Sequence, residues 1–193
     1  SNVVNDRRQR DDLQQRKNGH RANSRDLVIN KGERMATNYQ TQGTPILWKA
    51  SGGDHVLTLT SLANGAGQKG DVHDFGANLP QFIRVEMKTK IASSPVLGKT
   101  VDIWWASSVD NSTFDALIAA GDAALSDVDL VYQMRPIGNL VLLANTNAQL
   151  QSFDFAIPAR YGFPVIVNNS GQALSGTATD HAISIIPILG VIV

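Results

Sequence analysis

The residues of this chain that could bind a metal ion occur as Asp-His pairs. Imidazole and carboxylate groups are the ligands of many zinc sites, but such a site needs three or four converging ligands that are oriented by further hydrogen bonds. The chain contains no HExxH motif and no pair of histidines at helical spacing. The polarity of surface loops explains these pairs, so we expect no metal and no cofactor. The histidines and their acidic neighbours are His20, Asp54-His55, Asp71-Val72-His73-Asp74 and Asp180-His181.

The other residue patterns typical of enzymes are missing from the sequence. There is no cysteine, which excludes thiolate nucleophiles and disulfides, and no GxSxG nucleophile motif. The glycines of residues 63–79 lack the GxxxxGK[ST] pattern of a phosphate-binding loop. Asp127 and Asp129 are spaced as exposed residues of a strand, so we do not expect them to form a catalytic pair of carboxylates. We therefore expect a protein that is not an enzyme.

Alternating apolar and polar residues predict antiparallel strands, each with one face in solvent. The clearest pattern spans residues 81–91, where Ile83, Val85 and Met87 alternate with charged residues. Phe153, Phe155 and Ile157 form a second such pattern. Adjacent strand candidates are separated by turn residues. The strands expected besides these two lie at residues 45–50, 55–62, 100–107, 127–134, 139–144, 163–167 and 182–186.

The order of these elements favours a mostly β fold. We expect hairpins between residues 45–50 and 55–62 and between 127–134 and 139–144. One helix is expected after Ser112, which would be its N-cap, with Asp115 in a capping-box position. A parallel α/β fold would need helices between most strands. We therefore predict an antiparallel two-sheet β-sandwich with one short helix and an extended N-terminal arm.

The zero net charge of the 193 residues hides a division of the chain near Met35. Residues 1–34 contain nine Lys or Arg and five acids, a net charge of +4, whereas residues 35–193 have a net charge of −4. The first segment has no aromatic residue and too little apolar surface to fold alone. We predict a basic N-terminal arm at 1–34 and a β-sandwich domain at 35–193. The basic residues expected to bind a partner are Arg7, Arg8, Arg10, Arg16, Lys17, Arg21 and Arg25.

Two features of the arm limit its interpretation. Asp6, Asp11, Asp12 and Asp26 lie among the basic residues, which makes nucleic acid an unfavourable partner. Codons for Lys31-Gly32-Glu33 can resemble a bacterial ribosome-binding site just before the codon of Met35. We therefore also expect a shorter product that begins at Met35. Mass spectrometry of the native protein that detects only full-length chains would exclude it.

The domain resembles small β-sandwich proteins of the heads of tailed bacteriophages, the decoration or cement proteins. The segments that carry this resemblance are Ile157-Pro158-Ala159-Arg160-Tyr161-Gly162, the strand that ends in Asn168-Asn169-Ser170-Gly171-Gln172-Ala173-Leu174, and the last strand, which ends at Pro187. Together the similarity covers residues 36–188. It implies a jelly-roll-like virion protein on the capsid surface, made in the host cytoplasm, that bridges neighbouring capsomers. The implied partners are the major capsid protein and further copies of the chain, most simply as a homotrimer.

Apolar residues outside the expected core are the candidates for these contacts. Trp104 and Trp105 are adjacent in a strand and point to opposite faces, so one of them can fill the core and the other is then an exposed aromatic. The end of the chain would favour aggregation if it were free, so we expect it to pair with a strand of its own sheet or of a neighbour. An arm of 34 residues reaches about 110 Å when fully extended. The interface candidates are Trp104, Trp105, Ile188, Leu189, Val191, Ile192 and Val193.

Two other functions remain open at this point. One is a main jelly-roll shell protein whose basic arm faces packaged nucleic acid. The other is a glycan- or receptor-binding module of a fibre or spike, in which Trp104 or Trp105 and the loop around His73 contact the glycan. No membrane partner is expected, because the longest apolar run, residues 183–193, is far shorter than the roughly 20 residues of a membrane helix.

Overall fold

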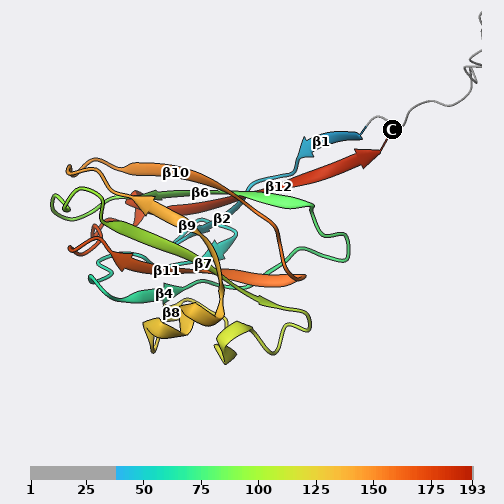
Figure 1. Cartoon of the computed structure of the whole chain (residues 1–193), viewed down its shortest axis with the longest axis horizontal. Coiled ribbons are helices and arrows are strands. Elements are labelled where there is room, and N and C mark those ends of the chain that lie inside the picture. Colours follow the sequence, from blue (N-terminus) through green and yellow to red (C-terminus); the bar gives the residue numbers. More distant parts are fainter. Residues whose placement is uncertain (1–37, 193) are drawn as a thin grey trace, which may run out of the picture. The chain divides into compact units, whose positions relative to one another are not determined.

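The computed structural model describes residues 38–192, which form two stacked β-sheets (Figure 1). The arm at 1–34, Met35 and Val193 lie outside the described residues. Apart from one short parallel pair, β2 with β3, all strand pairs are antiparallel. The first sheet consists of β1 (Asn38–Gln42), β2 (Ile46–Lys49), β3 (His55–Val56), β6 (Phe82–Thr89), β10 (Gln149–Phe155) and β12 (Ala182–Ile192). The second consists of β4 (Gly67–Lys69), β5 (His73–Asp74), β7 (Thr100–Ser108), β8 (Ala123–Ala124), β9 (Arg135–Val141) and β11 (Tyr161–Asn169).

The pairing of the eight main strands is that of a jelly roll. In chain order these strands are β2, β4, β6, β7, β9, β10, β11 and β12. The first pairs with the last, the second with the seventh, the third with the sixth and the fourth with the fifth. A long antiparallel hairpin that is rolled up so that successive pairs alternate between two sheets has this topology. The predicted antiparallel β-sandwich is confirmed.

The main core lies between the sheets and follows the predicted alternation. Ile83, Val85 and Met87 of β6 are fully buried and pack with Ile183 and Ile185 of β12. The intervening Arg84, Glu86 and Lys88 face outward from the sandwich, which explains the period of two along β6.

A second apolar cluster covers the outer face of the second sheet. Phe163, Val165 and Val167 of β11 pack there against residues of two 3-10 helical segments and the loops beside them, and Ile166 faces the main core. Strand β11 is therefore buried on both faces, so its apolar residues follow one another without alternation. The segments are η1 (Asp115–Leu117) and η2 (Val128–Gln133), and a third, η3 (Ala178–Asp180), precedes β12.

The helix predicted after Ser112 is shorter than expected. The carboxylate of Asp110 accepts hydrogen bonds from the backbone N–H groups of Ser112 and Thr113, at 2.9 and 3.0 Å. That of Asp115 accepts from the backbone N–H and the hydroxyl of Ser107, at 2.9 and 2.6 Å. Asp115 is thus bound to β7 and does not close a capping box. Only the single turn η1 forms, and its Ala116 has a positive φ of 57°.

Both predicted hairpins are wrong. Residues 127–134 form η2, because the side chain of Asp127 accepts the backbone N–H of Asp129 at 2.9 Å and caps a helical turn. Strand β9 follows and pairs with β7. In the other case β3 is only two residues long and runs parallel to β2, and Asp54 binds the backbone N–H of Leu47 at 2.8 Å across the turn.

The end of the chain pairs with β1, and the two strands extend from the sandwich as a ribbon (Figure 1). Along β12 the neighbour on one side changes from β2 to β1 at Pro187. The carbonyl of Pro187 accepts the N–H of Gly43 at 2.8 Å, so its backbone faces the side where β2 ends and β1 begins. Proline has no backbone N–H to donate, and it is tolerated here because the strand pairing is interrupted on that side. Of the two expected partners, a strand of the same sheet or one of a neighbour, the structure shows the first for Ile188–Ile192.

Candidate interaction surfaces

The two adjacent tryptophans have different environments. Trp105 is fully buried in the main core, where its ring lies edge-on to Trp48 at a centroid distance of 6.3 Å. Trp105 does not reach the surface, so the prediction that it could contact a partner or a glycan is wrong. Trp104 is half-buried on the opposite face and packs edge-on against Tyr132 at 6.1 Å. Of the pair, only Trp104 keeps exposed surface.

The ribbon, defined as β1 with Ile188–Ile192 of β12, contains most of the other predicted interface residues. Ile188 is buried, whereas the side chain of Leu189 is 40% exposed. The backbone of Val191 pairs with Tyr39 and that of Ile192 with Asn38. Strand β6 accompanies β12 only as far as Ile188, which lies opposite Phe82. Beyond that residue β1 is the only described partner of β12. Val193 and the seven basic residues of the arm lie outside the described residues.

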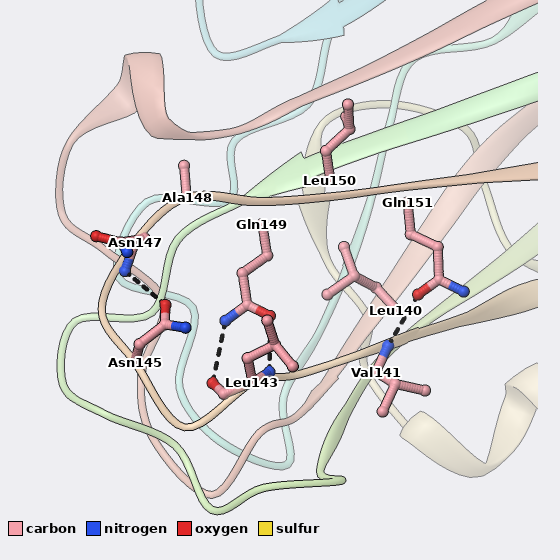
Figure 2. Close-up of a pocket in the computed structure, with 9 residues that line it drawn as sticks. All are labelled: Leu140, Val141, Leu143, Asn145, Asn147, Ala148, Gln149, Leu150 and Gln151. Carbon is pink, nitrogen blue, oxygen red and sulfur yellow. Dashed lines mark hydrogen bonds between the residues drawn. The ribbon is translucent and has the colours of Figure 1, made fainter.

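A groove of about 560 Å³ lies where the edge strands of the two sheets meet, β9 in the second sheet and β10 in the first (Figure 2). We call it the β9–β10 groove. On one wall Leu143 and Val141 extend from the end of β9, and on the other Leu150 lies between two glutamines at the start of β10. Asn145 and Asn147 belong to the connecting loop. The groove thus combines aliphatic and amide side chains, and none of the residues that line it is charged.

Two glutamine side chains join the edges of the two sheets at this groove by hydrogen bonds. The side-chain oxygen of Gln151 accepts the backbone N–H of Val141 at 3.1 Å, and that of Gln149 accepts the N–H of Leu143 at 2.8 Å. The amide of Gln149 also donates to the carbonyl of Leu143 at 3.2 Å. Figure 2 shows these bonds as dashed lines that join Gln149 to Leu143 and Gln151 to Val141. The glutamines satisfy backbone groups that an edge strand would otherwise leave unpaired.

Exposed apolar side chains gather around the groove. Val141, Leu143 and Leu150 are 53%, 57% and 66% exposed. The loop that carries Val96 and Leu97, also strongly exposed, is held beside them because Gly98 donates its N–H to the carbonyl of Leu142 at 3.1 Å. Apolar surface concentrated in this way is typical of an interaction site.

Two histidines of the Asp-His pairs, His55 and His73, meet between the two sheets. His55 of β3 belongs to the first sheet and His73 of β5 to the second, and their ring nitrogens Nε2 and Nδ1 are 2.8 Å apart. Trp48 stacks on the ring of His55 at a centroid distance of 4.7 Å. Within residues 38–192 no three His, Asp or Glu side chains converge closely enough to hold a metal ion. The pair is a hydrogen-bonded link between the sheets.

Burial lowers the pKa of three histidines. For His55 the carboxylates of Asp54 and Asp71 oppose the shift, and for His73 the charge of His55 adds to it. His181 is the most buried of the three, and its ring nitrogens contact the hydroxyl of Thr89 and the carbonyl of Ser175 at 2.8 and 2.9 Å, respectively. Desolvation lowers its pKa too. The folded protein therefore favours neutral imidazoles at these positions.

These shifts predict a loss of stability on acidification. Below about pH 6.5 these three histidines are protonated in the unfolded chain but stay largely neutral in the folded chain, because their pKa is lowered there. The free energy of unfolding therefore falls as the pH falls. A further loss is expected below about pH 4, because the hydrogen bond with Arg160 lowers the pKa of Asp74 to about 2. Chemical unfolding at pH 7.5, 6.5 and 5.5 measures the first step, and a His55→Gln variant should show a smaller fall. Equal stability at all three pH values would contradict it.

Sequence patterns alone did not identify the β9–β10 groove. Its only local signal is Gln149-Leu150-Gln151, in which an apolar residue takes the outward position of a strand. The groove also depends on the distant loop of Val96 and Leu97, which no local pattern places there.

No helix among residues 38–192 is long and apolar enough to span a membrane. Comparison of the chain with protein-family models and with curated proteins gives no match.

Proposed function

We propose that the protein is a structural virion protein, a decoration protein that binds the outer surface of a tailed-phage head. The jelly-roll pairing of its strands carries the proposal, because this topology recurs in capsid proteins, as well as in lectins and cupins. The resemblance of the segments around Ile157–Gly162 and Asn168–Leu174 to phage decoration proteins favours the capsid among these classes.

The distribution of surface features supports a role in bridging. The sandwich has an apolar ribbon strand and a groove of aliphatic and amide groups, both with exposed aliphatic side chains. The basic segment 1–34 precedes β1 in the chain, and β1 begins at Asn38. A protein with several separate contact elements can hold neighbouring capsomers together. Its partners are then the major capsid protein and other copies of the chain, in the simplest arrangement a homotrimer.

A main shell protein is the second candidate. The same jelly-roll topology forms the shells of many small viruses, and the net charge of +4 on residues 1–34 suits a segment that faces packaged nucleic acid. The four acids at Asp6, Asp11, Asp12 and Asp26 make this candidate the weaker one.

Co-sedimentation with empty heads that lack this protein tests the proposal. The full chain is expected to bind the heads saturably. A full-length variant with Gln at the seven basic positions between Arg7 and Arg25 should bind at least about tenfold more weakly, because even about 0.2 kcal/mol for each exposed charge pair amounts to about 1.4 kcal/mol. Higher salt should weaken binding of the unchanged chain more than that of the variant.

The same samples distinguish the two candidates. If the chain ignores the heads but retains nucleic acid in a salt-sensitive way, the shell-protein function replaces decoration. If it binds neither heads nor nucleic acid, both candidates are rejected.

A further inference from the structure

Among residues 38–192 no third strand or packing layer accompanies the ribbon beyond Ile188. Beyond the Phe82–Ile188 pair, β6 no longer accompanies β12, and β1 is its only described neighbour. An isolated pair of strands is marginally stable in water, and needs a further strand or a packing surface. The ribbon therefore presents two strand edges and an exposed Leu189 to whatever completes it.

The chemistry of the ribbon restricts that partner. Its two strands read NYQTQ and ILGVI, with no charged residue in either. Edge strands that remain free in solution commonly carry a lysine or another charge that blocks further pairing. The ribbon has no such charge, so an uncharged surface of aliphatic and amide groups suits it better than a charged one.

The β9–β10 groove is such a surface. Its walls consist of aliphatic side chains, among them Leu143 and Leu150, and of Asn and Gln amides, and no lining residue is charged. Its volume is about 560 Å³. Gln149 is already bonded to the backbone of Leu143. The amide nitrogens of Gln151 and Asn145, however, have no hydrogen bond within residues 38–192 and can donate to the backbone of a strand edge, while the leucines offer apolar contact to Leu189.

The ribbon and the groove of one chain lie at opposite ends of the sandwich. Gln149, at the groove, pairs with Thr89, and the adjacent Lys88 pairs with Ala182. The ribbon begins at Ile188, six residues further along β12, which corresponds to about 20 Å. Figure 1 shows the start of β10 and the ribbon at the two ends of the first sheet. The ribbon therefore cannot fold back into its own groove.

We propose that the ribbon of one copy docks in the β9–β10 groove of the next copy. The contact is head-to-tail, because it joins two different surfaces, and repeated copies form a closed ring or an open chain. This contact adds a mode of self-assembly to the proposed function. Only the role of the contact in a virus particle rests on that function. A ring such as the trimer expected of a decoration protein is the closed form of this contact.

Cross-linking of mixed variants tests the contact in solution, without heads. The chain has no cysteine, so Leu189→Cys on the ribbon and Leu150→Cys at the groove each add a single reactive thiol at an exposed position. A short bis-maleimide added to an equal mixture of the two should give at least about tenfold more mixed dimer than the control, because docked thiols meet at an effective concentration of mM or more. The control replaces Leu150→Cys by Val109→Cys, which is 81% exposed.

The other products of this experiment overturn the inference. Dimers from Leu189→Cys alone indicate a ribbon-to-ribbon contact, and dimers from Leu150→Cys alone a groove-to-groove contact. A yield equal to that of the control, at the highest concentration at which the chain stays in solution, excludes docking. Mixed dimers from a chain that does not bind heads would reject decoration and leave this contact standing.

A charge placed in the uncharged contact gives an independent measurement. In sedimentation velocity, Leu189→Glu is expected to abolish the self-association of the full chain, while Val109→Glu leaves it unchanged. Equal loss in both variants would attribute the effect to net charge and contradict the proposed contact.

Discussion

Replacement of Trp105 by alanine is expected to lower the free energy of unfolding by about 3–5 kcal/mol, the usual cost of removing a fully buried tryptophan. The Trp105 ring is inaccessible to solvent and contacts Trp48, Phe75 and Phe155, with centroid distances of 6.0–6.3 Å. Trp105 belongs to the second sheet and Trp48 and Phe155 to the first, so the cavity would lie at the interface of the two sheets. Since domains are stable by about 5–15 kcal/mol in total, much of the stability of the protein would be lost.

The neighbouring tryptophan provides a matched control. Trp104 is half-buried on the other face of β7, so Trp104→Ala is expected to cost about 1.5–2.5 kcal/mol, half the cost of removing a fully buried tryptophan. Urea unfolding of both variants, followed by far-UV circular dichroism, measures the difference. Equal losses of stability would mean that the two rings are not divided between core and surface as described.

The second large effect is expected from Gly162→Ala. Gly162 is buried in β11, and a Cβ at this position would overlap the indole ring of Trp105 at its Nε1, Cε2 and Cζ2 atoms. The ring cannot move away, because it is enclosed on all sides. Overpacking of this kind costs about 1–3 kcal/mol, and more where neither group can shift.

Gly176 is the appropriate control for this substitution. A Cβ there would meet only the hydroxyl oxygen of Ser61, at 3.3 Å, and Gly176 lies exposed before η3. Gly176→Ala is expected to change stability by less than about 1 kcal/mol, in either direction. Thermal unfolding of the two variants under the same conditions compares them. A Gly162→Ala protein as stable as Gly176→Ala would disprove the close approach of β11 to Trp105.

Several strands could be predicted because their own residues impose a period of two. Ile83, Val85 and Met87 are apolar and their neighbours are charged, so only one face of β6 can be buried. The same reasoning predicted the alternation of Phe153 and Phe155 in β10. It failed at residues 127–134, where the apolar residues also fit a helical turn and the capping bond of Asp127 decided between the two.

The sequence by itself was enough to predict an antiparallel β-sandwich. That information is local, because alternation and turn residues can be read within a few positions. Only the tertiary structure decided which tryptophan is buried, that His55 meets His73, and that a groove forms beside Gln149 and Gln151. These features depend on strand order and register, which bring together residues far apart in the chain. In a jelly roll the first strand pairs with the last, and no local pattern specifies such a partner.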